Sequence, residues 1–84
     1  MTKEKLLKET KEELCDNFGI SSDTVITDDM KFVDDFGFDS LDIIEFVLWF
    51  EGTYKVSVSD EELDKIQTVG EYLALGLKLI NEKK

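Results

Sequence analysis

Residues 40–52, SLDIIEFVLWFEG, constrain the fold most, because a helix formed by them is apolar on two opposite sides. At about 100° per residue, one apolar group gathers on the side that is typical of a helix packed on a core. This group consists of Ile43, Phe46, Val47 and Phe50. A second group falls nearly opposite, where a helix of a small domain is normally polar. This second stripe consists of Leu41, Ile44 and Leu48.

Two interpretations of the second stripe stay open, because a chain of 84 residues forms only one modest core. Either the long connection before the helix folds back and covers the stripe, or the stripe stays exposed. Glu45 lies on the same face, and Asp42 and Glu51 flank it. An exposed apolar stripe with an acidic rim suits transient protein partners, since apolar contact gives affinity and charge steers the approach.

The sequence before and through this segment predicts two long helices. The chain contains no proline, the residue that most strongly interrupts helices. Apolar residues at helical spacing predict a first helix over residues 3–17, with Gly19 as a plausible stop after it. The second helix is expected to run from Ser40 to about Gly52.

Two capping boxes predict two further helices. Ser59 and Glu62 are three residues apart and are expected to open a short helix. Thr68 and Glu71 repeat the spacing and are expected to open a last helix that continues to about residue 80.

The remaining segments complete an all-α prediction. Residues 19–38 are too long for a plain turn, and their apolar residues indicate that this connection packs over the core. Residues 54–59, YKVSVS, alternate like a strand, but one isolated strand has no partner. The predicted fold is a small four-helix bundle, with three main helices, one short helix and a long loop between the first two. A single domain over residues 1–84 is expected.

Composition excludes several classes of function. The chain has no histidine, so it cannot form a Ser-His or Cys-His dyad, and an enzyme is not expected. A formal net charge of −10 would repel nucleic acids and anionic membranes, and no apolar run approaches the roughly 20 residues that span a bilayer. Neither calcium-loop spacing nor a zinc ligand set is present, so no metal site is expected. A single cysteine and a polar N-terminus without a signal peptide predict a cytoplasmic location.

Acidic residues are concentrated around the second helix. Residues 28–51 hold eight acidic residues, with Lys31 as the one basic residue among them. Such a face can simply be solvated and keep the protein soluble. The sharper interpretation is a docking surface for proteins that carry a basic patch.

Ser40 stands at the start of the second helix, and three interpretations of it compete. As an N-cap, its hydroxyl would accept a hydrogen bond from the amide of Asp42 or Ile43, although Asp39 could do the same. As a nucleophile it would need a general base, and solvated aspartates are too weakly basic near neutral pH. As a modification site, it offers an accessible hydroxyl at a helix start, where free amides and the helix dipole tolerate a phosphate.

The segment FVDDFGFDSLDIIEFV, residues 32–47, strongly resembles the prosthetic-group segment of acyl carrier proteins. The shared pattern is an acidic residue, an apolar residue and glycine, then one residue before Asp-Ser-Leu and an apolar, acidic helix. Its Gly-x-Asp-Ser-Leu core spans Gly37 to Leu41. The sequence SDEELDKIQTVGEYLALGLKLI, residues 59–80, also resembles the third and fourth helices of that family. The resemblance covers about residues 3–80.

The resemblance implies a carrier protein. A separate phosphopantetheinyl transferase would attach 4′-phosphopantetheine from coenzyme A to Ser40, and the thiol of this arm would hold acyl groups as thioesters. The chain would present these groups to fatty-acid or related biosynthetic enzymes with basic docking patches, and it would act as a monomer. By position, the recognition surface of the family carries over to six residues: Asp39, Leu41, Asp42, Ile44, Glu45 and Leu48.

The sequence also departs from the family's common pattern. Four aromatic residues are bulkier than those common at their places and could narrow an acyl cavity: Phe36, Phe38, Trp49 and Phe50. Ser59 stands where a proline is frequent, and its capping role is expected to preserve the fold. Two alternatives stay open: a peptidyl or polyketide carrier, and an interaction module of the same fold whose serine is never modified.

Overall fold

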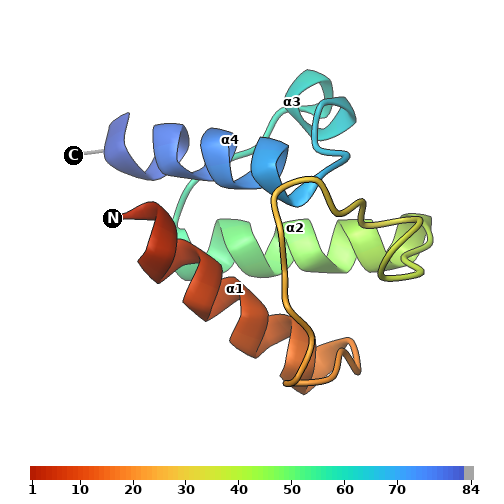
Figure 1. Cartoon of the computed structure of the whole chain (residues 1–84). Coiled ribbons are helices and arrows are strands. Elements are labelled where there is room, and N and C mark those ends of the chain that lie inside the picture. The colour runs from red at the N-terminus through yellow and green to blue at the C-terminus, as the bar shows by residue number, and fades with distance from the viewer. Residues whose placement is uncertain (83–84) are drawn as a thin grey trace.

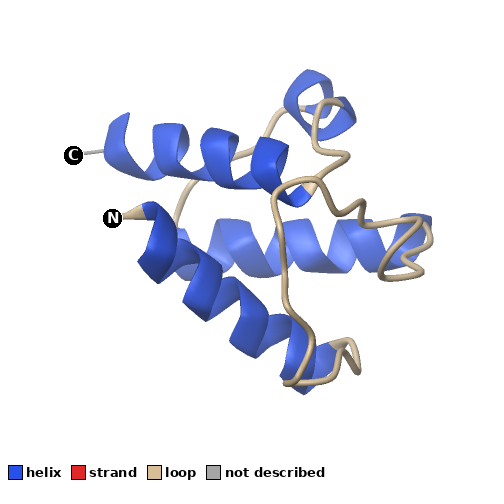
Figure 2. Cartoon of the chain, in the orientation of Figure 1, coloured by secondary structure: helices blue, strands red, loops and turns tan. Residues whose placement is uncertain are grey.

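The computed structural model describes residues 1–82, which form four helices (Figures 1 and 2). The helices are α1 (Lys3–Asn17), α2 (Ser40–Tyr54), α3 (Asp60–Asp64) and α4 (Val69–Glu82). Within these residues strand-like pairing is limited to an isolated antiparallel bridge between Lys31 and Thr68, so the all-α prediction is confirmed. No helix of the described chain is long and apolar enough to cross a membrane. Residues 83 and 84 of the predicted domain lie outside the described residues.

The helices begin where short polar side chains satisfy their first amides. Both predicted capping boxes are present. The amide of Glu62 donates to Ser59 Oγ at 3.2 Å, and the amide of Glu71 donates to Thr68 Oγ1 at 3.1 Å. Each glutamate in turn accepts a hydrogen bond from the amide of its partner. The bonds from Ser59 lower the pKa of the Glu62 carboxyl, because they stabilise its charged form.

Helix α2 ends two residues beyond the predicted stop at Gly52. This glycine lies inside the helix and is exposed, so it weakens the helix by only about 1 kcal/mol relative to alanine. The last helical residue is Tyr54, and Lys55 caps the helix: it adopts a left-handed conformation with φ of 56° and donates its amide to the carbonyl of Glu51. The Glu51 carboxylate also accepts a 2.8 Å hydrogen bond from the amide of Val58. This bond holds the segment that follows α2, which has no regular secondary structure, close to the end of the helix.

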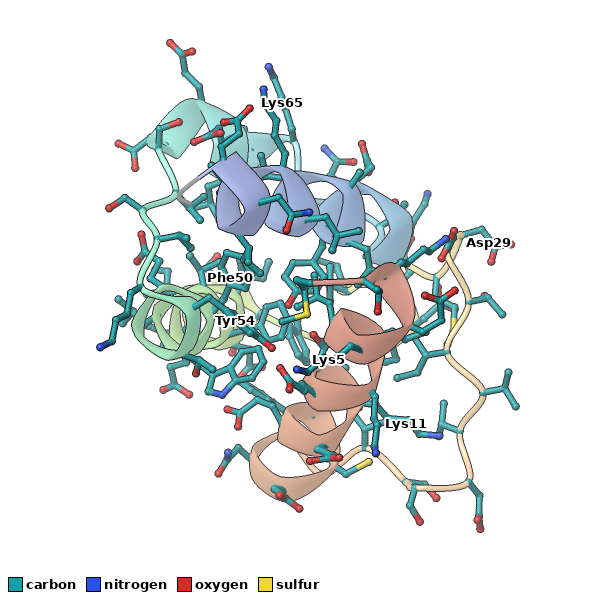
Figure 3. The ribbon with its side chains drawn as sticks, turned by 90° about the vertical axis from the view of Figure 1, so that its left-hand side faces the viewer. Lys5, Lys11, Asp29, Phe50, Tyr54 and Lys65 are labelled. Carbon is teal, nitrogen blue, oxygen red and sulfur yellow. The ribbon has the colours of Figure 1, made fainter. Side chains whose placement is uncertain are left out.

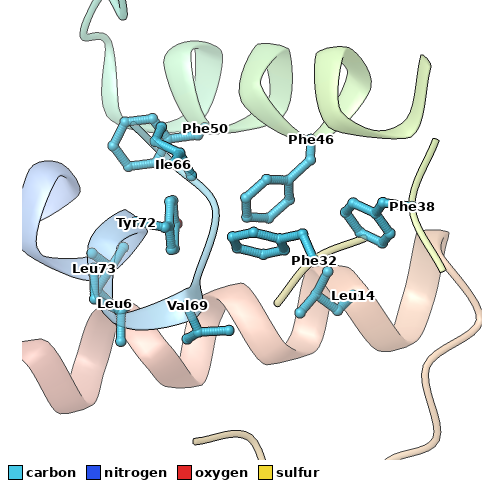
Figure 4. Packing of buried hydrophobic residues seen from close by; sticks show 10 residues of the cluster. All are labelled: Leu6, Leu14, Phe32, Phe38, Phe46, Phe50, Ile66, Val69, Tyr72 and Leu73. Carbon is cyan, nitrogen blue, oxygen red and sulfur yellow. The ribbon is translucent and has the colours of Figure 1, made fainter. Parts of the chain in front are cut away.

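The core is an aromatic cluster enclosed by α1, α2 and α4 (Figure 4). Phe46 points from α2 onto Phe32, and their ring centroids lie 5.3 Å apart. Tyr72 of α4 lies 5.0 Å from the Phe46 ring, and its hydroxyl forms a buried 2.8 Å hydrogen bond with Thr10 of α1. Figure 3 shows Phe50 pointing from α2 toward the interior. The core therefore joins three helices through rings rather than through aliphatic side chains alone.

The long loop contributes directly to this core, as predicted. Phe32 and Phe38 are both buried. The middle of the long loop runs beside the start of α4 (Figure 1). There the amide of Val69 donates to the Met30 carbonyl at 2.9 Å, and the amide of Gly70 donates to the Asp28 carbonyl at 2.8 Å. A Cβ atom at Gly70 would lie only 3.0 Å from the Cβ atom of Asp28, so a side chain at this position would push the loop away from α4 by a few tenths of an ångström.

Candidate functional site

The two apolar groups of α2 have opposite environments. Phe46, Val47 and Phe50 are 2%, 9% and 3% exposed, whereas Leu41, Ile44 and Leu48 are 68%, 48% and 60% exposed. Ile43 is partly buried and packs against the core. The interpretation in which the long loop covers the second stripe is therefore wrong. That loop is instead hydrogen-bonded to the start of α4, and it leaves the outer side of α2 open.

Glu45 is exposed beside this stripe, and Asp42 is half-buried at the start of the helix. We call Leu41, Asp42, Ile44, Glu45 and Leu48 the outer face of α2. The face combines exposed apolar area with carboxylates, and it begins next to Ser40.

Ser40 is the first residue of α2 and is exposed. The interpretation of Ser40 as the N-cap is wrong, because Asp39 has that role. The Asp39 carboxylate accepts a 2.9 Å hydrogen bond from the amide of Asp42, and the Asp42 carboxylate accepts a 3.2 Å bond from the amide of Asp39. Asp39 has extended backbone angles that suit an N-cap, and aspartate caps as well as serine does. The Ser40 hydroxyl is therefore not required to start the helix.

The start of α2 also provides a favourable environment for an anion on the Ser40 oxygen. The amides of Ser40 and Leu41 lie in the first turn, where no intrahelical acceptor can reach them. The helix dipole adds partial positive charge at this end. A phosphate ester on Ser40 would therefore lie close to unsatisfied donors, which partly offset the repulsion from the nearby carboxylates.

A groove of about 530 Å³ opens beside Ser40. Its walls come from the turn that precedes α2, from α2 itself, and from the end of α3 with the residues that follow. It is lined by Lys31, Phe32, Val33, Asp34, Ser40, Ile43, Ile44, Leu63, Asp64, Ile66 and Gln67. The groove places a mostly apolar surface within reach of any group attached to Ser40.

Lys31 lines the same groove, and its Nζ atom lies 3.9 Å from a carboxylate oxygen of Asp34. Both side chains are more than half exposed, so this ion pair is weak. Lys31 is the one cation of the acidic stretch 28–51, and it lies at the groove rather than on the outer face.

These residues can hold a group but cannot activate Ser40 on their own. The Asp39 and Asp42 carboxylates are engaged in capping the helix, and the chain has no histidine. An exposed hydroxyl, a helix start and an adjoining apolar groove fit a phosphate-linked arm that a separate enzyme attaches. The sequence predicted Ser40 and the residues of the outer face as site candidates, and the resemblance implied an acyl cavity, but the residues that line the groove were not predicted. Leu63 and Ile66, which follow the Ser59–Glu62 capping pair, were the signal available for the groove.

Comparisons with known proteins point to the same kind of site. The family model described as phosphopantetheine attachment site matches residues 8–75. An acyl carrier protein of Akkermansia muciniphila is 44% identical over 61 residues, covering 73% of this chain and 75% of that protein. One from Lactobacillus acidophilus is 35% identical over 71 residues, covering 84% and 88%.

Solved structures agree with the sequence matches. The crystal structure of an acyl carrier protein from Thermotoga maritima superposes with a TM-score of 0.85 at 29% identity, covering 98% of this chain and 94% of that one. The acyl carrier protein of Enterococcus faecalis superposes with a TM-score of 0.76 at 33% identity, covering 94% and 99%.

Proposed function

Because the chain belongs to the family of phosphopantetheine-dependent acyl carrier proteins, it carries acyl groups and is not an enzyme, and we propose that Ser40 bears its 4′-phosphopantetheine arm. The observation that carries this assignment is the position of Ser40: exposed, first in α2, and free of the capping role that Asp39 performs. When attached, the arm supplies a thiol that forms thioesters with acyl groups.

Attachment needs chemistry that the transferase must provide. A bond forms between Ser40 Oγ and the phosphorus of the phosphopantetheine phosphate, while the bond from that phosphorus to the adenosine bisphosphate part of coenzyme A breaks. The proton of the Ser40 hydroxyl passes to a base of the transferase, since this chain offers no such base nearby. The contribution of this chain is the exposed hydroxyl and the helix start, whose amides favour the phosphate.

The test of this assignment is the intact mass after incubation with coenzyme A, magnesium and a broad-specificity phosphopantetheinyl transferase. We expect the mass to increase by one phosphopantetheine, and Ser40→Ala to abolish the increase. Ser57→Ala, which changes another exposed serine, should leave the increase unchanged. Modification that survives Ser40→Ala would refute the assignment. An unmodified Ser40 in protein from the native host would instead favour an interaction module without the arm.

We propose that the outer face of α2, together with Asp39, binds basic patches on the transferase and on acyl-handling enzymes. Support comes from the exposed leucines and isoleucine and from the carboxylates beside them. Apolar contact would supply affinity, and charge would supply orientation and speed of encounter. A carrier must leave each enzyme after delivery, which favours a small surface over a large permanent interface.

The same carboxylates support a monomer, because two copies meeting through their outer faces would bring like charges together. We further propose that residues 1–84 form one acyl-carrier domain that works in the cytoplasm with fatty-acid-type enzymes. The names of the relatives, all acyl carrier proteins, support this cargo class over peptidyl cargo.

A further inference from the structure

Lys31 is the one positively charged residue in the lining of the groove beside Ser40. The other charged residues of the lining are Asp34 and Asp64, and the two aspartates that form the capping box of α2 are close to Ser40 in the chain. A phosphate ester on Ser40 would therefore add negative charge where carboxylates already outnumber cations. Among the residues that line the groove, only Lys31 can offset that charge.

The backbone of Lys31 is fixed by hydrogen bonds on both sides. Its amide donates to the Asp35 carboxylate at 2.6 Å, and its carbonyl accepts from the Asp35 amide at 2.8 Å. The next amide, that of Phe32, donates to the Gln67 carbonyl at 3.2 Å, and Lys31 pairs with Thr68 in the isolated bridge. These bonds tie the turn before α2 to the segment before α4, so the lysine side chain starts from a fixed place at the groove.

The end of the Lys31 side chain, by contrast, is held only weakly. Its Nζ atom lies 3.9 Å from a carboxylate oxygen of Asp34, which is longer than a hydrogen bond. The two side chains are 58% and 69% exposed, so water screens their attraction. An ammonium group on a flexible stem binds phosphate well as a point charge. Lys31 can therefore turn from Asp34 to a phosphate, or contact both, while its backbone stays in place.

We propose that Lys31 pairs with the phosphate of the arm on Ser40 and orients the base of the arm toward the groove. The inference rests on attachment of the arm to Ser40. Lys31 is then a positioning residue that contacts the phosphate and leaves the thiol at the far end of the arm free. Because the pair is exposed, it is weak, and basic side chains of a partner enzyme can replace Lys31 when the arm enters their active site.

The first test compares each protein with and without the arm. Wild type, Lys31→Gln and Lys5→Gln are prepared in both forms, and intact mass confirms that the loaded form carries one arm. The melting temperature of the loaded form minus that of the unloaded form isolates the effect of the arm. Lys31→Gln should make this difference more negative than in the wild type by about 2–4 °C at low salt. In about 1 M salt, where screening acts within about 3 Å, the change should disappear.

Lys5→Gln is the matched control, because it removes the same charge from an exposed lysine in the first turn of α1. Figure 1 shows this end of α1 away from the start of α2. Its difference between loaded and unloaded forms should equal that of the wild type. Lys31→Arg keeps the charge and should also give the wild-type difference. A purely structural role of Lys31 would lower the melting temperature of both forms equally and leave the difference unchanged.

The second test observes the phosphate itself by phosphorus NMR of the loaded proteins. In Lys31→Gln the resonance should narrow and move toward its position in the urea-unfolded loaded protein, because the phosphate has lost its partner. Lys5→Gln and Lys31→Arg should retain the wild-type resonance.

The pairing is refuted if Lys31→Gln leaves either the melting difference or the phosphorus resonance as in the wild type. It is also refuted if Lys5→Gln changes them as much, since the effect would then come from net charge. Mass analysis separates these results from failure of the proposed function. If Ser40 is not loaded, the attachment proposal fails and this inference fails with it. If Ser40 is loaded, the results bear on Lys31 alone.

Discussion

The inner and outer faces of α2 are both apolar, yet they have opposite fates. On the inner face, Phe46 and Phe50 are almost completely buried among other rings. On the outer face, Leu41 and Leu48 leave more than half of their surface in water. The two faces differ in the size of their side chains and in the residues that surround them. Large aromatic rings pack together on the inner face, whereas aliphatic side chains alternate with carboxylates on the outer face. Apolar character alone therefore does not decide which side of a helix enters a core.

We infer from this difference that the inner face stabilises the fold and that the outer face serves recognition, as proposed above. Burial removes the inner rings from water and stabilises the folded state. The exposed area of the outer face contributes little to folding, but it remains available for burial against a partner. If this division is correct, substitutions on the two faces should affect different measurements.

Removal of an inner ring should produce the largest effect. Phe46→Ala should lower the free energy of unfolding by about 3–5 kcal/mol, because a large cavity replaces a ring that is 2% exposed. Leu48→Ala, on the outer face, should change it by less than about 0.5 kcal/mol. Urea unfolding followed by circular dichroism measures both. Equal losses in the two variants would show that the outer face also belongs to the core.

The inner face should also determine how the protein responds to alkaline pH. Burial raises the pKa of the Tyr72 hydroxyl, and the hydrogen bond with Thr10 only partly opposes this shift. Above about pH 10 the unfolded chain loses the tyrosine proton while the folded chain keeps it. The stability from this group is therefore complete below that pH and is lost as the pH rises.

The control for this alkaline effect is the double variant Thr10→Val, Tyr72→Phe. Replacing both partners by apolar groups of similar shape should be nearly neutral near pH 7 and leave no unpaired hydroxyl. Between about pH 9 and pH 11, the unfolding free energy of the double variant should fall less steeply than that of the wild type. Parallel curves would mean that Tyr72 does not contribute to the alkaline loss.

Much of this division could be predicted from the sequence, because its signals are local. The capping pairs at Ser59 and Thr68 act over three residues, and the two apolar stripes repeat at helical spacing. The predicted end of α2 at Gly52 was wrong, because Lys55 adopts a left-handed conformation that residues with a side chain rarely take.

The N-cap and the groove were harder to predict for different reasons. Asp39 and Ser40 are adjacent and both cap well, so only backbone geometry decides between them. The groove combines the turn near Lys31, the start of α2 and the residues around Leu63. These segments are distant in sequence, and no periodic pattern places them together.

Charge reversal on the outer face should affect recognition and leave folding intact. Glu45→Lys should lower kcat/KM for modification of Ser40 by about tenfold at low salt, equivalent to about 1.4 kcal/mol. The loss should shrink above about 0.15 M salt, where screening acts within roughly 8 Å. Transferase kinetics at two salt concentrations measure it, with circular dichroism to confirm the fold.

Two variants complete this comparison. Glu12→Lys makes the same change of charge at an exposed position on α1 and should leave kcat/KM nearly unchanged. Leu48→Ala should lower kcat/KM with little dependence on salt, because it removes apolar contact rather than charge. If Glu12→Lys and Glu45→Lys slow the transferase equally, net charge matters and the outer face has no special role.

Modest effects on stability are expected at Asp39 and Ser40, the residue pair where α2 begins. Asp39→Ala should lower the free energy of unfolding by about 0.5–2 kcal/mol, because the amide of Asp42 loses its capping acceptor. Ser40→Ala should change it by less than about 0.5 kcal/mol, although this variant is expected to abolish modification. Asp39→Asn should retain most of the lost stability, since asparagine caps nearly as well. Urea unfolding of the three variants separates the cap from the attachment residue. If Ser40→Ala costs as much as Asp39→Ala, the serine contributes to helix initiation, and its exposure does not reflect a role in attachment alone.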